Sequence, residues 1–347
     1  MSKRTKQVIR AVLGIALAIG IISWGFPRLA HTTWAAVFEN LKAVSPWHSL
    51  GFLGLVLVGL WSYTFTFTGS LPGLSHWRAF VVNICGSSVS NLLPGGGAVG
   101  LAATYTILRS WGFKNRDVST SAIVTGVWNT LARIALPIIA IIMLWWGNDG
   151  LPAALTRLAW GGALTGLTIL GVFVAILASE KAAQTIGRGL DRVLAPLFRR
   201  RKRTMSIADL VHDMRGRIND VVRNGWLQMT LGMVGFFGFY YLLFVLIMRA
   251  VGVDELPLGI LFAAFAIGRL LTAVGVTPGG LGITESAMVF ALVEWGADGT
   301  AALTGAILFS IFTHLMEVPL GALGWLTWSM SPKAAPEEIE AAEATAH

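Results

Sequence analysis

Runs of apolar residues long enough to cross a lipid bilayer recur along this chain. They occupy residues 8–26, 50–68, 119–146, 158–178, 226–249 and 301–329. A helix needs about 20 apolar residues to cross a hydrocarbon core of about 30 Å. Hydrophobic residues make up 55% of the 347 and charged residues only 13%, which excludes an ordinary soluble domain. We therefore predict an all-α polytopic membrane protein with about six full spans.

Two further apolar regions, residues 77–112 and 257–296, are interrupted by proline and glycine. The first contains the sequence LLPGGGAVGL and the second contains TPGGLGITES. Lipid cannot satisfy free backbone N–H and C=O groups, so a broken helix is stable in a membrane only where protein or a water-filled cavity covers it. Each region is predicted to form either a re-entrant helical hairpin or two tilted crossings. Both alternatives bring the chain back to the side of the membrane that it left.

The two interrupted regions also match in spacing. Pro94 to Gly112 and Pro278 to Gly296 are both 18 residues apart, and two glycines follow each proline. Each region lies between two apolar runs. Similar halves in opposite orientation are typical of transporters, whose substrate site lies at the midplane where the helices are broken. We therefore predict an inverted-topology repeat.

Residues 1–329 are predicted to form one transmembrane domain, with half-repeats at about 1–146 and 158–329. A basic, amphipathic segment, residues 180–225, holds 11 of the 26 lysines and arginines. Because it lies beside apolar runs, its expected partners are anionic lipid head groups rather than nucleic acid. The tail, residues 330–347, is polar and acidic and is predicted to be disordered.

The positions of lysine and arginine also predict the orientation, since positively charged loops stay in the cytoplasm. With both termini and residues 180–225 inside, 20 of the 26 positive side chains are cytoplasmic and 4 are outside. Arg133 and Arg269 are then within the membrane. We expect a multi-pass protein of the cell membrane, whose first interrupted region opens from the cytoplasm and whose second opens from outside.

Glu285 falls in the first turn of a half-helix expected to start near Gly282. A helix N-terminus has a positive dipole end and unpaired N–H groups, which suit a phosphate or carboxylate. Glu285 is therefore either a carboxylate that stabilises this N-terminus or a proton or cation site, or a partner for a substrate ammonium. Arg269, in the preceding half-helix, is its expected ion-pair partner.

Arg133 and Glu317 form a second candidate ion pair, because they lie near the middle of corresponding apolar runs in the two halves. His314 is one helical turn from Glu317 and on the same face. Two interpretations remain open. The charges form a structural ion pair that joins the halves, or the arginines bind an anion.

Motifs for other chemistry are weak. Gly95, Gly97 and Gly100 satisfy GxGxxG, but no strand precedes them in this apolar region, so a dinucleotide site is not expected. Cys85 is the single cysteine, and there is no paired set of histidines or cysteines for zinc. We expect no catalytic residues, no metal and no cofactor.

The stretches PGGGAVGLAATYTILRSWG and TPGGLGITESAMVFALVEWG resemble the two signature regions of a flippase-like membrane family that includes the transmembrane part of lysylphosphatidylglycerol synthases. The resemblance covers most of residues 8–329, and the second motif is the more specific. It implies movement of lipids between leaflets. Many relatives carry Glu and Arg after the glycines of the first motif, where this chain has Gly100 and Ala103, which argues against a charged site in that half. The sequence ends soon after its last apolar run, so it resembles the flippase part without the soluble aminoacyl-transferring domain.

We therefore predict a lipid flippase that moves an anionic phospholipid or a polyprenyl-phosphate-linked lipid by alternating access at a midplane cavity, and not an enzyme. Its partners would be membrane lipids and either a lipid synthase or a glycosyltransferase, with no nucleic acid. The alternatives are a membrane-embedded transferase acting on a lipid-linked substrate and a non-transporting accessory subunit of a lipid synthase. The residues assigned to substrate binding are Pro94, Gly95, Gly96, Gly97, Arg133, Arg269, Pro278, Gly279, Gly280, Gly282, Glu285, His314 and Glu317.

Overall fold

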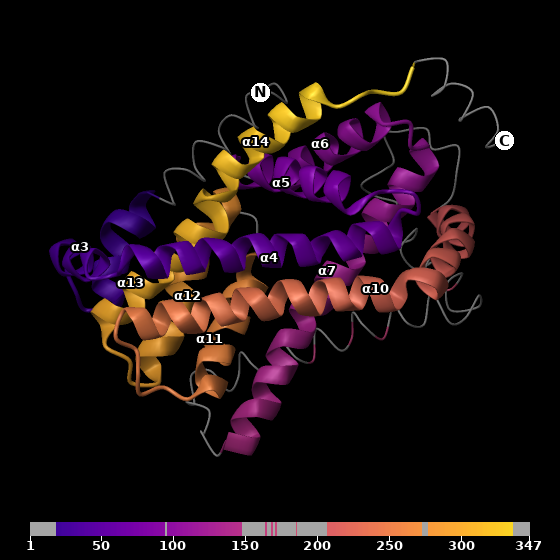
Figure 1. The fold of residues 1–347 in the computed structure, drawn as a ribbon. Helices are drawn as coiled ribbons and strands as arrows, with labels where there is room; N and C mark the ends of the chain where they lie inside the picture. The colour runs from indigo at the N-terminus through magenta and orange to yellow at the C-terminus, as the bar shows by residue number, and fades with distance from the viewer. Residues whose placement is uncertain are drawn as a thin grey trace, which may run out of the picture.

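The computed structural model describes residues 19–93, 96–147, 207–272 and 277–335, the isolated positions 164, 168, 171 and 185, and only the backbone of residues 207–217. Outside these residues lie residues 8–18 of the first predicted run, most of the run at 158–178, most of segment 180–225, most of the tail, and both Pro94 and Gly95. Within the described part of the chain the protein is helical and contains no strand (Figure 1).

The described helices match the predicted runs at 50–68 and 119–146, whereas the helix over the run at 226–249 begins at Ile207, inside segment 180–225. In chain order they are the π turn η1 (Ile21–Gly25), α2 (Phe26–Leu29), α3 (Trp34–Lys42), α4 (Pro46–Ser70), α5 (His76–Leu92), α6 (Gly97–Ser110), α7 (Asn115–Gly147), α10 (Ile207–Ala250), α11 (Leu258–Leu271), the 3-10 turn η3 (Pro278–Gly280), α12 (Ile283–Glu294), α13 (Gly299–Ser310), the π turn η4 (Ile311–Leu315) and α14 (Glu317–Met330). Side chains cap several of these helices. Ser75 accepts a hydrogen bond from the backbone N–H of Arg78 at the start of α5, for example.

Four described helical stretches are long and apolar enough to cross a membrane. They are Pro46–Ser70, Asn115–Gly147, Ile218–Ala250 and Gly299–Met330. Each contains one of the predicted spans. Large apolar side chains point outward from them, including Trp145 and Trp146 at 79% and 81% exposure, as expected for surfaces that face lipid rather than water. The chain is therefore a multi-pass membrane protein.

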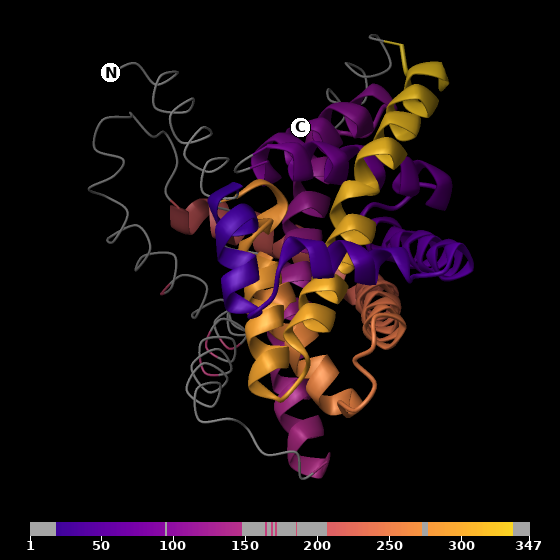
Figure 2. The ribbon, with the colours of Figure 1, turned by 90° about the vertical axis from the view of Figure 1, so that its left-hand side faces the viewer.

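The helices α4 and α10 lie side by side along the middle of the molecule and run antiparallel (Figures 1 and 2). Gly69, near the end of α4, meets Gly225, and Gly59 meets Tyr240 further along α10. A Cβ on Gly225 would lie 2.1 Å from the carbonyl oxygen of Gly69, so only glycine permits this approach. Small residues at helix contacts are the usual way that membrane helices pack closely.

Two hairpins, α5–α6 and α11–α12, correspond to the two interrupted regions, and the arms of each pack against each other. The arms contain 17, 14, 14 and 12 residues. At about 1.5 Å per residue, even the longest is shorter than the hydrocarbon core of about 30 Å. The long helices pack across the halves, because α14 lies on α5 while α7 lies on α11.

Both of the long helices that follow a hairpin are irregular. Helix α7 contains Pro137. The predicted run at 301–329 is not one regular α-helix, because α13 passes through the π turn η4 before α14 begins. Pro319 lies in the first turn of α14, and its missing N–H cannot bond to the preceding turn. A π turn of this kind is rare and recurs at functional sites.

Candidate functional site

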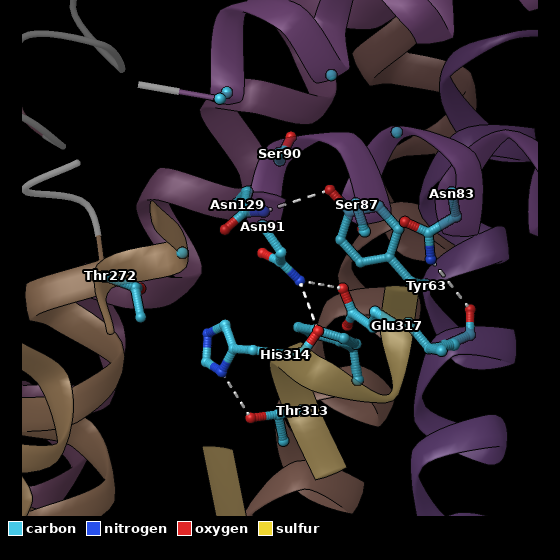
Figure 3. A pocket seen from close by; sticks show the side chains of 18 of the residues that line it. Tyr63, Asn83, Ser87, Ser90, Asn91, Asn129, Thr272, Thr313, His314 and Glu317 are labelled. Atoms are coloured by element: carbon cyan, nitrogen blue, oxygen red, sulfur yellow. Dashed lines mark hydrogen bonds between the residues drawn. The ribbon is translucent and has the colours of Figure 1, made fainter. Parts of the chain in front are cut away.

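A cavity of about 510 Å³ lies between the two hairpins, and we call it the polar cavity. Side chains and backbone from α4, α5, α6, α7, α10, α11, η3, η4 and α14 line it (Figure 3). Eight of the predicted substrate-binding residues are among them: Gly96, Gly97, Arg133, Arg269, Gly279, Gly280, His314 and Glu317. The fold therefore brings residues of both halves to one place.

A second cavity, of about 370 Å³, adjoins the first, and we call it the apolar cavity. Pro278, Gly282 and Glu285 line it, and His314 lines both cavities. Every predicted site residue within the described part of the chain therefore faces one of these two spaces. The remaining two, Pro94 and Gly95, lie outside the described residues.

The break between α11 and α12 is built by glycines in the left-handed region of backbone conformation. Gly279, Gly280 and Gly282 have φ values of 58°, 78° and 87°, which other residues rarely adopt. However, the N–H of Gly280 donates to the carbonyl of Thr277, and the N–H of Gly282 donates to Glu285. Both N–H groups thus already have acceptors within the turn, and neither is free for the phosphate expected at this helix N-terminus.

Glu285 completes this turn. One carboxylate oxygen accepts hydrogen bonds from the Gly282 N–H at 2.7 Å and from the Thr284 hydroxyl at 3.0 Å. The other accepts from the hydroxyl of Ser310 on α13. Helix α12 begins at Ile283, as expected, and the carboxylate lies in its first turn. The geometry thus favours the interpretation that Glu285 stabilises a helix N-terminus.

Arg133 connects α7 to the end of α11. Its Nε donates to Asn129 at 2.7 Å, and one of its terminal nitrogens donates to the carbonyl of Arg269 at 2.8 Å and to the hydroxyl of Thr272. The carbonyl of Arg269 lies in the last turn of α11, where cations are stabilised by the helix dipole. Arg133 therefore places a positive charge in the polar cavity next to the broken helix.

Arg269 is buried in the wall of the same cavity at 5% exposure. Its guanidinium lies 4.8 Å from the ring centroid of Phe309 and 5.7 Å from that of Tyr240, in cation–π geometry. One terminal nitrogen contacts the Thr313 hydroxyl at 3.5 Å, while Nε has no hydrogen-bond partner. The hydroxyl of Thr277, at 1% exposure, likewise has none. Such buried groups normally have partners, so they mark a place for a ligand or water.

Glu317 faces the polar cavity from the first turn of α14 (Figure 3). Its carboxylate accepts hydrogen bonds from the amide nitrogen of Asn91 at 2.9 Å and from the hydroxyl of Tyr240 at 3.2 Å. Asn91 also donates to the carbonyl of His314 at 3.4 Å, and the ring of His314 hydrogen-bonds to Thr313 at 3.0 Å. One asparagine thereby joins the end of α5 to both η4 and α14.

The two predicted ion pairs are not formed. Among the described residues only Lys42 and Glu39, on the surface helix α3, lie at ion-pair distance. Arg133 bonds to carbonyl and hydroxyl oxygens instead of Glu317, and Glu285 accepts from neutral donors instead of Arg269. Because the arginines have no carboxylate partner, their charge is available to an anion. The described lining of the polar cavity holds two arginines and one carboxylate.

Sequence reasoning missed the neutral polar residues of the site. Asn91, Asn129, Tyr240 and Thr313 all line the polar cavity and hold its charged residues in place. Each is a polar side chain inside an apolar run, which is the signal that points to them. In the described ranges no three His, Cys, Asp or Glu side chains gather in a way that could hold a metal ion.

Comparison with known families identifies the membrane region of a lipid synthase. The model for the lysylphosphatidylglycerol synthase TM region matches residues 11–321, which is most of the chain. It covers both hairpins and all thirteen predicted site residues. No curated protein matches the sequence significantly.

Proposed function

This chain belongs to the family of lysylphosphatidylglycerol synthase TM regions, and we propose that it is a lipid flippase. It moves an anionic phospholipid or a polyprenyl-phosphate-linked lipid between leaflets by alternating access at the polar cavity. It does so without changing the lipid chemically, in the cell membrane. The carrying observation is that two arginines, the half-buried Arg133 and the buried Arg269, face this cavity without a carboxylate partner, and that Arg269 has an unpartnered N–H.

The head group binds between the arginines. Charge-assisted hydrogen bonds from arginine to phosphate are stronger than neutral ones, and the cavity wall excludes bulk water. Arg269 and Thr277 offer donors without partners, and Asn91 and Asn129 hold the surrounding groups in place. Cation–π contacts keep the Arg269 guanidinium in position while the cavity is empty.

Alternating access follows from an inverted repeat with two re-entrant hairpins. The repeat is supported by the antiparallel contact of α4 with α10 and by the reciprocal packing of α14 on α5 and α7 on α11. Arg133 and Glu317 are separated along the chain by the same distance as Pro94 and Pro278, so they occupy equivalent positions. The short arms of both hairpins favour re-entrant segments over full crossings.

The orientation is tested by impermeant cysteine labelling. The impermeant reagent is expected to label Lys42→Cys from outside the cell, and to label Lys333→Cys only after the membrane has been permeabilised. The native thiol, Cys85, is buried and contributes little background. The reverse pattern would contradict the proposed cytoplasmic position of the C-terminus.

The function is tested in phosphatidylcholine proteoliposomes that contain fluorescent phosphatidylglycerol in both leaflets. A membrane-impermeant quencher measures how much of the probe in the inner leaflet becomes accessible with time. Wild-type protein is expected to expose it, and Arg269→Gln to slow exposure about tenfold or more, because charge-assisted hydrogen bonds contribute about 1.5–3 kcal/mol. Arg28→Gln is the matched control, since Arg28 is an exposed arginine stacked on Trp24, outside the cavity.

Three outcomes separate the alternatives. Exchange of unaltered lipid supports the flippase. A lipid of changed mass supports a membrane-embedded transferase, and neither exchange nor product supports an accessory subunit of a lipid synthase or a glycosyltransferase. Equal exchange by Arg269→Gln and wild type would remove the polar cavity from the mechanism.

A further inference from the structure

The polar and apolar cavities lie side by side and share part of their walls. Asn91 and His314 line both of them. Gly279 lies between these two side chains, because a Cβ on it would lie 3.3 Å from Cδ2 of His314 and 3.4 Å from Oδ1 of Asn91. The end of α5, the turn η3 and the π turn η4 therefore converge on a single boundary, with a charged wall on one side and an apolar wall on the other.

The apolar cavity suits hydrocarbon. Its wall is formed on one side by residues near the N-terminus, including Ile22, Phe26 and Trp34, and on the other by α13 and η4, including Ile307 and Ile311. The only carboxylate among its described lining residues belongs to Glu285, and three donors already bind it. Ser310 is one of these donors. The carboxylate of this wall is thus occupied within the protein.

A lipid is an amphipathic ligand that has the same division into a charged part and an apolar part. Its head group carries charge, and its chains must stay in apolar surroundings while the head group is at the midplane. A volume of about 370 Å³ lies within the range of about 300–1,000 Å³ typical of small-ligand sites. Because Asn91 and His314 line both cavities, this space lies directly beside the charged one.

From this juxtaposition, and resting on the proposed function, we propose that the apolar cavity binds one hydrocarbon chain of the same lipid whose anionic head group binds in the polar cavity. Asn91 and His314 then lie beside the region of the lipid that joins head group to chain. The membrane interior is itself apolar, so the cavity does not bind the chain through a hydrophobic driving force. Its role is to hold the chain in one direction relative to the head group.

Photolabelling tests the proposal directly. The probe is phosphatidylglycerol with a diazirine at the methyl end of one acyl chain, in phosphatidylcholine vesicles that contain the wild-type protein. Peptides from residues 19–34 and 307–318 are expected to carry the label. Unlabelled phosphatidylglycerol should remove that label, whereas extra phosphatidylcholine should not. Label confined to outward surfaces, such as that around Leu323, would overturn the proposal.

A matched pair of variants adds a transport readout. Ile307→Trp fills the apolar cavity, whereas Leu323→Trp adds the same bulk at a position of α14 that is 60% exposed and lines neither cavity. We expect Ile307→Trp to reduce both the labelling of residues 307–318 and phosphatidylglycerol exchange about tenfold, because the larger side chain occupies the space that the hydrocarbon chain would fill. Leu323→Trp should leave both at the wild-type level. Equal behaviour of the two folded variants would contradict the proposal.

The two proposals fail in different ways. If wild-type protein exchanges phosphatidylglycerol but the chain-end probe never labels the apolar cavity, the chain site is wrong and the flippase stands. If the probe labels the cavity competitively but no exchange occurs, the chain site stands and transport is wrong.

Discussion

The two Pro-Gly-Gly regions use glycine for different purposes. In the first, Gly96 has an ordinary φ of −59°, and a Cβ on it would lie 2.2 Å from the carbonyl oxygen of Ser90. Gly100 similarly lies against Gly86 of the facing helix. These glycines allow close packing of α5 and α6. In the second region Gly279, Gly280 and Gly282 have positive φ and form a turn. The described glycines of the first region therefore build a helix contact, whereas those of the second region build a turn at positive φ.

The difference extends to charge. Glu285 stabilises the start of α12. The equivalent position in α6 is Leu101, because Leu101 and Glu285 are as far apart in the sequence as Pro94 and Pro278. Likewise Cys85 of α5 corresponds to Arg269 of α11. Sequence symmetry thus indicates backbone architecture more reliably than it indicates a shared site. The charged groups of the first half come instead from α7, through Arg133.

Gly96→Ala is expected to have the largest effect on folding. Two backbone oxygens, those of Ser90 and Leu93, lie within 2.7 Å of the new Cβ, and neither can move like a flexible side chain. We expect a loss of about 3 kcal/mol or more, measured as a lower thermal midpoint and lower folded yield in detergent. Gly97→Ala is the control, because nothing lies within 4 Å of a Cβ there. Similar losses in both would contradict the packing role.

Glu285→Ala comes next, because it leaves the Gly282 N–H and the Ser310 hydroxyl without an acceptor, while the Thr284 hydroxyl can still donate to the carbonyl of Gly280. The expected cost is about 2–3 kcal/mol, in line with the loss of partners for buried polar groups. Glu285→Gln retains one acceptor oxygen and should cost clearly less. Thermal unfolding of the two variants measures the difference. If Gln were as damaging as Ala while exchange also ceased, a proton or cation role for the carboxylate would replace the capping role.

Gly280→Ala tests the turn itself. A residue with a Cβ at a φ of 78° costs about 1–2 kcal/mol, and Cγ2 of Thr284 lies 3.1 Å from the new atom. Insertion should survive because the long apolar helices do not depend on this turn, while lipid exchange should fall. Gly238→Ala, in the open part of α10, is the control. For the larger Gly280→Leu we expect a folded protein without transport, and normal exchange by it would show that the break only kinks a helix.

The smallest expected effect is the coupling between Arg133 and Glu317. Since they bind different partners, the double change Arg133→Ala with Glu317→Ala should destabilise by the sum of the single changes, within about 0.5 kcal/mol. A buried ion pair would instead make the double variant more stable than that sum, since a single change leaves an uncompensated charge. Chemical denaturation in detergent provides all four values. Strong coupling would restore the original ion-pair hypothesis and remove the free charge from the cavity.

Local patterns predicted much of the fold. Apolar runs place the long helices, and the prolines and glycines place the break before α12, because these depend on neighbouring residues alone. The partners of Arg133 and Glu285 were predicted wrongly, because a charged side chain in a membrane also finds carbonyls, hydroxyls and N–H groups that sequence spacing does not reveal. The contribution of Asn91 required knowing that α5 ends against η4, which is a contact between residues far apart in the chain.

The π turn at Ile311–Leu315 has a mechanical consequence. A π turn interrupts the regular backbone hydrogen bonds of an α-helix, and such turns are common places for a helix to bend. The segment from α13 to α14 is therefore two regular helices joined by an irregular turn, rather than one continuous helix. Helix α14 packs on α5 of the first hairpin, and α13 packs on α12 of the second. A small change of angle at the π turn would therefore displace the two hairpins relative to each other. Because the π turn lines the polar cavity, this cavity can change shape while α13 and α14 remain helical.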